Sequence, residues 1–386
     1  MTLSQELESR VGHLVKWAKG RNTGPFALTL GMTYVCNLRC TFCALRRATP
    51  EDNMRRGGEE LPEERLIRLV REAAQMGVEQ VNVSGGGEPF LRQKTLSVMR
   101  AIKHHGMRGA MTSNGTLISE EAAEEMVRIG WDHVNLSIDG PNPETHDYLR
   151  DAPGSFELAT RAASTLHRLK LKYNRPSPAV GIHTVLTQPN HNQVFNMVRL
   201  VHELGATEFT LIPLTVHYPE QESLRLLPDH WDAFRSGLER AKDFAEGKGI
   251  STNLDDFSDR SLVLESNDMI DNHLAPSGDD SALRKMIHSL RLKIRRDDFS
   301  RIPCYEPWFT LVIHPDGYID PCEMVNKVSH IGDRSLSELW SEDAHLRAMR
   351  KDFLKGRLPA TCAKCCGPLV VQNVRMREHL SRLGVC

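Results

Sequence analysis

The chain has 386 residues, of which 40% are hydrophobic and 26% charged, and its formal net charge is −1. This length suits one large domain plus a smaller one, while a charge near zero gives no support for nucleic-acid or anionic-membrane partners. The first twenty residues contain no apolar run long enough for a signal peptide or a membrane span. We therefore expect a cytoplasmic protein whose nine cysteines serve as metal ligands rather than disulfides.

The predicted elements alternate over the first half of the chain. A short amphipathic helix precedes a buried strand at 26–30. Helices are then expected at 62–76, 93–105, 119–129, 155–171 and 193–204, and strands at 78–83, 107–112, 133–138, 179–186 and 208–214. Such alternation predicts an α/β fold with a parallel sheet, and six right-handed units predict a partial (β/α)6 TIM-like barrel. Functional residues are then expected at the C-terminal ends of the strands.

Three cysteines follow the first predicted strand with the spacing C-x3-C-x2-C: Cys36, Cys40 and Cys43. Soft thiolates suit iron, and three of them on one loop can hold three corners of a [4Fe–4S] cluster, which leaves the fourth iron open. The alternatives are a zinc knot or chance clustering. Zinc normally takes four ligands in two paired halves, and no further Cys or close His follows before His104.

With Phe42 just before its last cysteine, this loop resembles the signature of the radical S-adenosylmethionine (radical SAM) enzymes. The resemblance implies that SAM binds the open iron through its amino and carboxyl groups. One electron from the cluster then cleaves SAM to methionine and a 5′-deoxyadenosyl radical. It also implies a partial barrel and a low-potential electron donor such as flavodoxin or ferredoxin.

Polar or glycine-rich segments follow the next strands. Gly85, Gly86, Gly87 and Glu88 resemble the family's GGE motif, which holds the methionine amino group of SAM, although three glycines alone indicate a tight turn. The resemblance further implies contacts with the ribose, carboxylate and adenine of SAM from Ser113, Asn114, Ser137, Asp139 and Leu214. Taken alone, the polar residues among these indicate helix N-caps or turns.

Two residues of the predicted barrel are candidate catalytic groups. Arg150 ends the segment 146–150, which resembles the HD-x-x-R stretch of radical SAM enzymes with an additional cluster domain. Its planar guanidinium can fix a carboxylate or hydroxyl, and a helix-start salt bridge is the alternative. His183 lies among apolar neighbours in the fifth strand, where a satisfied core histidine is the alternative.

The regular alternation stops beyond residue 215. A helix is expected at 229–246, another strand at 250–254, and a basic helix at 283–296. We expect an N-terminal helix at 1–25, the barrel at 26–255, a helical insertion or linker at 256–303, and an auxiliary domain at 304–386.

A second set of cysteines begins at Cys304. An Asp-Gly turn at 316–317 predicts a β-hairpin between Cys304 and Cys322, and Cys362 and Cys365 add two thiols at C-x2-C spacing. Four thiolates can hold a second [4Fe–4S] cluster, or alternatively a zinc ribbon. Beside a radical SAM loop, the set resembles a SPASM or shorter twitch domain. Only Cys366 and Cys386 remain, so we expect one auxiliary cluster, which is the twitch pattern.

The expected reaction is the two-electron oxidation of a small polyol, amino sugar or similar alcohol, with the auxiliary cluster as electron acceptor. Peptide or protein modification by a maturase is an alternative, although only 35 residues precede the first loop cysteine. A redox-neutral epimerisation is another alternative, in which Cys366 or Cys386 returns a hydrogen atom to the substrate. Both cysteines could instead serve only in packing. A non-catalytic iron–sulfur redox sensor remains open as a different class of protein.

Overall fold

The computed structural model describes residues 3–18, 23–47, 52, 60–84, 86–258, 302, 304–322, 329–357, 373, 376 and 377. Outside these described residues lie the expected basic helix at 283–296, Gly85, Cys362, Cys365, Cys366 and Cys386.

One mostly parallel sheet of ten strands runs through the described residues in the order β10-β9-β8-β1-β2-β3-β4-β5-β6-β7. The strands are β1 (Ala27–Gly31), β2 (Gln80–Ser84), β3 (Arg108–Ser113), β4 (His133–Ser137), β5 (Ala179–Leu186), β6 (Glu208–Pro213), β7 (Ser251–Thr252), β8 (Thr310–Ile313), β9 (Tyr318–Asp320) and β10 (Ser329–His330). Neighbours from β1 to β7 are parallel, so the predicted partial barrel is confirmed.

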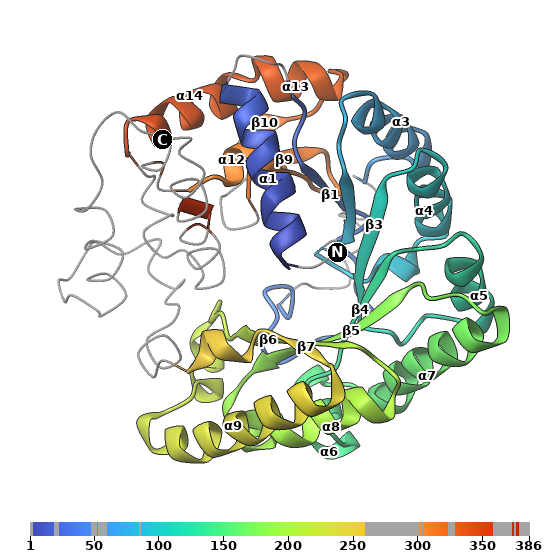
Figure 1. Ribbon diagram of the computed structural model, residues 1–386, viewed down its shortest axis with the longest axis vertical. Helices are drawn as coiled ribbons and strands as arrows, with labels where there is room; N and C mark the ends of the chain where they lie inside the picture. The colour runs from blue at the N-terminus through green and yellow to red at the C-terminus, as the bar shows by residue number, and fades with distance from the viewer. Residues whose placement is uncertain are drawn as a thin grey trace.

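The helices are α1 (Leu3–Ala18), α3 (Glu63–Gln75), α4 (Lys94–His104), α5 (Glu120–Arg128), α6 (Pro143–Arg150), α7 (Ser155–Tyr173), α8 (Val194–Glu203), α9 (Trp231–Lys248), α12 (Glu306–Phe309), α13 (Leu336–Glu342) and α14 (Ala344–Leu354). Helices α3, α4, α5, α7, α8 and α9 cover the outer side of this curved sheet (Figure 1). The crossover helices and strands predicted up to residue 214 all occur, with ends shifted by a few residues. Helix α6 was not expected, although Asn142 caps it and Pro143 begins it.

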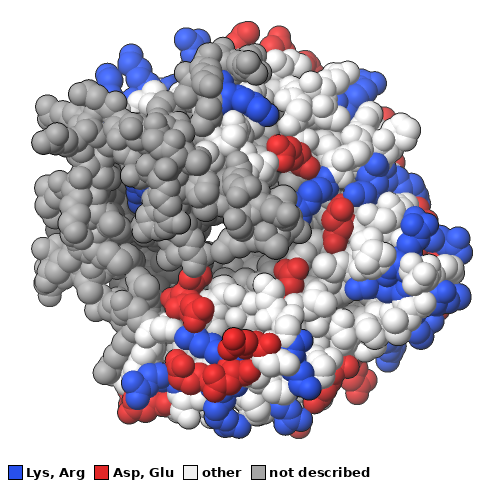
Figure 2. Space-filling view, in the orientation of Figure 1, with Lys and Arg blue, Asp and Glu red and all other residues white. Residues whose placement is uncertain are grey.

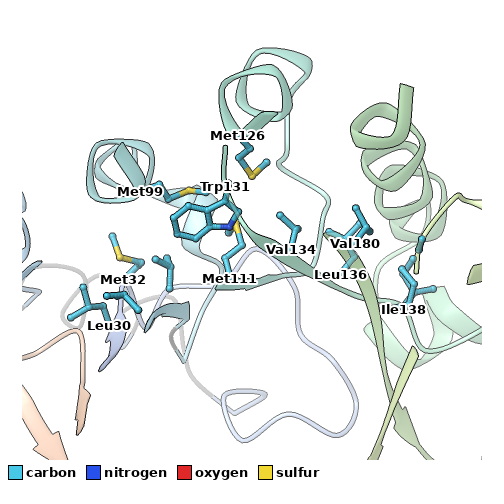
Figure 3. Close-up of a cluster of buried hydrophobic side chains, with 14 of the residues drawn as sticks. Leu30, Met32, Met99, Met111, Met126, Trp131, Val134, Leu136, Ile138 and Val180 are labelled. Atoms are coloured by element: carbon cyan, nitrogen blue, oxygen red, sulfur yellow. The ribbon is translucent and has the colours of Figure 1, made fainter. Parts of the chain in front are cut away.

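The main hydrophobic core lies between the sheet and the helices on its outer side (Figure 3). Trp131 is fully buried there, and Gly109 of β3 makes room for it: a Cβ at Gly109 would lie 2.2 Å from the Trp131 ring. Successive side chains of a strand point to opposite faces, so the residues between the core positions face the concave side. This face carries the half-buried polar residues Asn82, Thr112, Asn135, His183 and Thr210.

Strand β8 joins the C-terminal part of the chain to the barrel. It pairs in parallel with β1, from Ala27 opposite Thr310 to Leu30 opposite Ile313. The predicted hairpin follows, with β9 antiparallel to β8 and with Gly317 at φ +80° in the turn. The two parts of the chain expected to carry clusters therefore share one sheet, and the domain boundaries stay a prediction.

Within the part of the chain that the structure describes, none of the helices combines the length and apolar character needed to cross a bilayer. Lys and Arg side chains alternate with Asp and Glu over the described part of the face in Figure 2, so charges of both signs are mixed there.

Candidate metal centre

Three cysteine thiols lie on the loop that follows β1. Cys40 is buried, Cys36 and Cys43 are half-buried, and all three are free of disulfides. Each sulfur accepts one N–H hydrogen bond: Leu38 N to Cys36 Sγ at 3.5 Å, Leu45 N to Cys43 Sγ at 3.3 Å, and Arg150 Nη1 to Cys40 Sγ at 3.6 Å. N–H donors to sulfur are the usual surroundings of iron–sulfur cluster ligands.

This donor set fits a cluster better than a single ion. Among the described residues, no three His, Cys, Asp or Glu side chains converge as ligands of one metal ion do. Three corners of a cubane need no such convergence, because each cysteine binds a different iron. Burial raises the pKa of the Cys36 thiol to about 11 and also raises that of Cys40. Iron must therefore displace protons when it binds here.

The segment after β2 is hydrogen-bonded to the cysteine loop. Gly87 N donates to Thr33 O and Glu88 N to Val35 O, both at 2.9 Å. A Cβ at Gly87 would lie 1.9 Å from Val35 O, so only glycine permits this approach. Gly86 has a similar constraint, because its Cβ would lie 2.7 Å from the Tyr34 ring. These glycines hold the two loops together, and their expected contact with SAM stays a prediction.

Glu88 brings the ends of β2 and β3 together. Its carboxylate is 2% exposed and accepts hydrogen bonds from Ser113 Oγ (2.8 Å), Asn114 N (2.8 Å) and Phe90 N (3.1 Å). The Asn114 amide donates to Asn37 Oδ1 in the cysteine loop at 2.9 Å. Burial raises the pKa of Glu88, while these donors lower it. Three of the expected SAM-binding residues thus form one network beside the cysteines.

Arg150, the last residue of α6, sets a buried cation against the cysteine loop. Its Nη2 lies 2.5 Å from Asp139 Oδ2, and its guanidinium lies 5.4 Å from the centre of the Phe42 ring. Burial alone would lower the pKa of Arg150, but Asp139 and Cys40 raise it above the ordinary value. Asp139 is 0% exposed and also accepts from Val185 N at 2.7 Å. The described geometry makes Asp139 a support for Arg150, and its expected contact with SAM stays a prediction.

The histidine and aspartate of the HD-x-x-R segment hold neighbouring backbone. His146 Nδ1 accepts from Asp139 N at 3.1 Å, and burial followed by the Arg150 charge lowers the pKa of His146 to about 3. Asp147 accepts from Ser155 Oγ (2.9 Å) and Phe156 N (2.8 Å) at the start of α7. Both residues therefore fix the position of α6, which carries Arg150.

His183 lies on the concave face of β5, in register with Ser137 of β4. Burial, with a smaller contribution from His133, lowers the pKa of His183 to about 4. The imidazole is therefore neutral near pH 7 and presents a hydrogen-bonding group rather than a charge. The expected roles of His183 in catalysis and of Ser137 in SAM binding stay predictions.

The segment after β6 holds the cysteine loop from the other side. Leu214 belongs to a small apolar cluster against which Phe42 packs. In the 3₁₀ helix η3 (Pro219–Leu224), the buried Gln221 donates to Thr41 O at 3.0 Å and to Cys43 O at 3.3 Å. Sequence reasoning missed Gln221, because no local motif signals a contact across so many residues.

The auxiliary cysteines are described in part. Cys304 and Cys322 are half-buried and lie on either side of the hairpin. Tyr34 of the cysteine loop donates a hydrogen bond from its hydroxyl to Asp316 Oδ1 at 3.1 Å. Its ring also stacks on the His314 ring, with 6.4 Å between the ring centres. The turn between β8 and β9 therefore contacts the loop that carries Cys36.

Two family models match the chain. Residues 30–201 match the model described as the radical SAM superfamily, and residues 304–366 match an iron–sulfur cluster-binding domain, SPASM.

Several curated proteins are similar in sequence. The AdoMet-dependent heme synthase of Methanosarcina barkeri is 29% identical over 192 residues, 49% of this chain and 51% of that protein. The mycofactocin maturase MftC of Mycolicibacterium smegmatis is 30% identical over 183 residues, 47% of this chain and 43% of that protein. The PqqA peptide cyclase of Ruegeria pomeroyi is 24% identical over 353 residues, 88% of this chain and 79% of that protein. The first two alignments span only about half the length of those relatives.

Among solved structures, Streptococcus suis SuiB bound to S-adenosylmethionine superposes with a TM-score of 0.62 at 17% identity. The superposition covers 89% of this chain and 72% of SuiB. At this identity the likeness establishes the fold alone.

Proposed function

Because residues 30–201 belong to the radical SAM superfamily and residues 304–366 to the SPASM family of iron–sulfur cluster-binding domains, we propose that this protein modifies a peptide by radical chemistry. Its cofactors are SAM with a [4Fe–4S] cluster, and auxiliary iron–sulfur clusters in the SPASM domain. A single auxiliary cluster, as in a twitch domain, remains part of the proposal.

The observation that carries the choice of substrate is the extended similarity to the PqqA peptide cyclase, which reaches from the barrel into the SPASM domain. The mycofactocin maturase adds a second relative of this kind. Support therefore moves from the oxidation of a small polyol, expected from the sequence, to its alternative of peptide modification. The polar concave face of the barrel suits a peptide, because it can hydrogen-bond backbone amide groups.

Cys36, Cys40 and Cys43 would hold the cluster, which would supply the electron for the reductive cleavage of SAM and so the means of removing a hydrogen atom from the substrate. The chain's own part is to hold and orient. Glu88 fixes Ser113 and Asn114 at the SAM-binding edge, while Arg150 holds a permanent positive charge beside Cys40. The neutral His183 gives the concave face a hydrogen-bonding group within reach of a substrate on that side.

The cluster assignment is tested by replacing Cys36, Cys40 and Cys43 with Ala. Reconstituted anaerobically, this variant should lose SAM cleavage under dithionite and about half of its iron, because one of two clusters is removed. A triple variant that still releases 5′-deoxyadenosine would show that these thiols do not hold the SAM-binding cluster.

The substrate is tested by isotope transfer to 5′-deoxyadenosine. One set of reactions contains synthetic peptides in which a single residue type is deuterated, and the other contains deuterated inositols and amino sugars. We expect deuterium in 5′-deoxyadenosine from the peptide set alone, with a product peptide lighter by two hydrogen atoms if the change is oxidative. Label from the polyol set alone would overturn the peptide proposal.

A further inference from the structure

Asn373 contacts the first cysteine of the SPASM region. Its side chain is 5% exposed, and its amide group bridges two successive residues. Asn373 Nδ2 donates to Cys304 Sγ at 3.7 Å, while Asn373 Oδ1 accepts from Tyr305 N at 2.8 Å. The bond to Tyr305 fixes the amide plane, so that the N–H group stays directed at the sulfur.

Arg377 adds a half-buried positive charge near the same place. Its Nη1 donates to Ile302 O at 3.1 Å, so the side chain crosses the chain just before Cys304. Burial lowers the pKa of Arg377, and the nearby Tyr305 and Cys304 groups oppose this shift. Between Asn373 and Arg377, Met376 is 1% exposed and packs in the core with Ile302 and Tyr305. The packing of Met376 holds the segment that carries both polar groups against the residues around Cys304.

We propose that Asn373 and Arg377 raise the reduction potential of the auxiliary cluster that Cys304 ligates. Reduction places one more negative charge on the cluster and its thiolates. An N–H donor at a sulfur and a half-buried cation nearby stabilise this reduced form more than the oxidised form. A higher potential makes the cluster a better electron acceptor. The inference depends on the SPASM cluster and is independent of whether the substrate is a peptide.

The experiment compares the reconstituted full-length protein with its N373D variant. The Asp side chain keeps an oxygen for Tyr305 N and replaces the N–H donor by an anionic oxygen. Redox titrations followed by electron paramagnetic resonance distinguish the clusters, since only the SAM-binding cluster changes its spectrum when SAM is added. We expect the reduced-to-oxidised ratio of the auxiliary cluster to fall at least tenfold at fixed solution potential, roughly 59 mV for a one-electron couple. The SAM-binding cluster should keep its potential.

Two Arg variants complete the test. R377Q keeps an amide N–H for Ile302 O but removes the charge. The reduction potential of the auxiliary cluster should therefore also fall in this variant. R357Q removes an equal charge from an Arg that is 63% exposed and paired with Asp352, and it should shift neither cluster. Unchanged auxiliary potentials in both N373D and R377Q, or an equal shift in R357Q, would overturn the proposal. If N373D loads no auxiliary cluster, R377Q decides alone: a fall supports the proposal and no change overturns it. SAM cleavage by wild-type protein tests the proposed function separately.

Discussion

Glu88 is a buried carboxylate whose two oxygens are occupied by donors from its own segment and from the end of β3. A Gln there sets an NH2 group against at least one of these donors. We expect the free energy of unfolding of E88Q to be about 1–3 kcal/mol lower than that of the wild type, which is the usual cost of a buried hydrogen-bonding group left unpaired. Urea unfolding under anaerobic conditions measures this change.

The control for this prediction is Glu120, whose side chain is 60% exposed and forms an ion pair with Arg168 at 2.9 Å. Exposed ion pairs contribute roughly 0–1 kcal/mol to stability, so the free energy of unfolding of E120Q should remain close to that of the wild type. Equal free energies of unfolding for E88Q and E120Q would contradict the structural role of Glu88.

His146 should make the fold sensitive to acid. Its pKa is about 3 in the folded protein against an ordinary value of 6.5, so the unfolded chain takes up the proton first as pH falls. The folded state therefore loses stability below pH 6.5, by about 1.4 kcal/mol per pH unit from this residue. H146N keeps an oxygen to accept from Asp139 N and removes the titration. Urea unfolding from pH 7.5 to 5.5 should give a shallower slope for H146N, and equal slopes would refute this role.

At the scale of elements, the loops after β1 and β2 contact each other at Gly87. We expect G87A to lose most of the SAM-binding cluster, because a Cβ 1.9 Å from Val35 O forces the two loops apart. Iron and sulfide analysis after reconstitution measures the loss. In α1, G12A is the matched change: a Cβ at Gly12 meets no atom within 4 Å, so iron should be unaffected. Full iron in G87A would mean that the loops need not approach so closely.

The sequence could predict those elements that show a local hydrophobic periodicity or carry a recognisable motif. Cys36, Glu88 and Asn114 follow successive strands, and parallel strands bring their C-terminal ends to one edge, so their proximity was predictable. The contacts of Gln221 with the cysteine loop and of Asn373 with Cys304 carry no local signal, because nothing within either segment specifies its distant partner. Asp139 was expected at SAM by resemblance, whereas its burial against Arg150 depends on where α6 packs.

The whole molecule depends on the pairing of β1 with β8, which no sequence pattern indicated. The segment from residue 23 to 258 contains β1–β7 but would leave the β1 edge without its partner. Exposed edges of buried strands recruit other chains. We expect this fragment to aggregate where the full chain does not, as light scattering after size-exclusion chromatography would reveal. A monomeric, folded fragment would show that β8 is dispensable for the barrel.

The same pairing limits how chimeric enzymes can be built from this scaffold. Exchanging the C-terminal module for that of another enzyme at a junction after Ile313 would retain the native neighbour of β1. A junction before Glu306 would import a foreign strand in its place. That strand would have to match the register from Ala27 to Leu30, so grafting at the earlier point requires redesign of both partners.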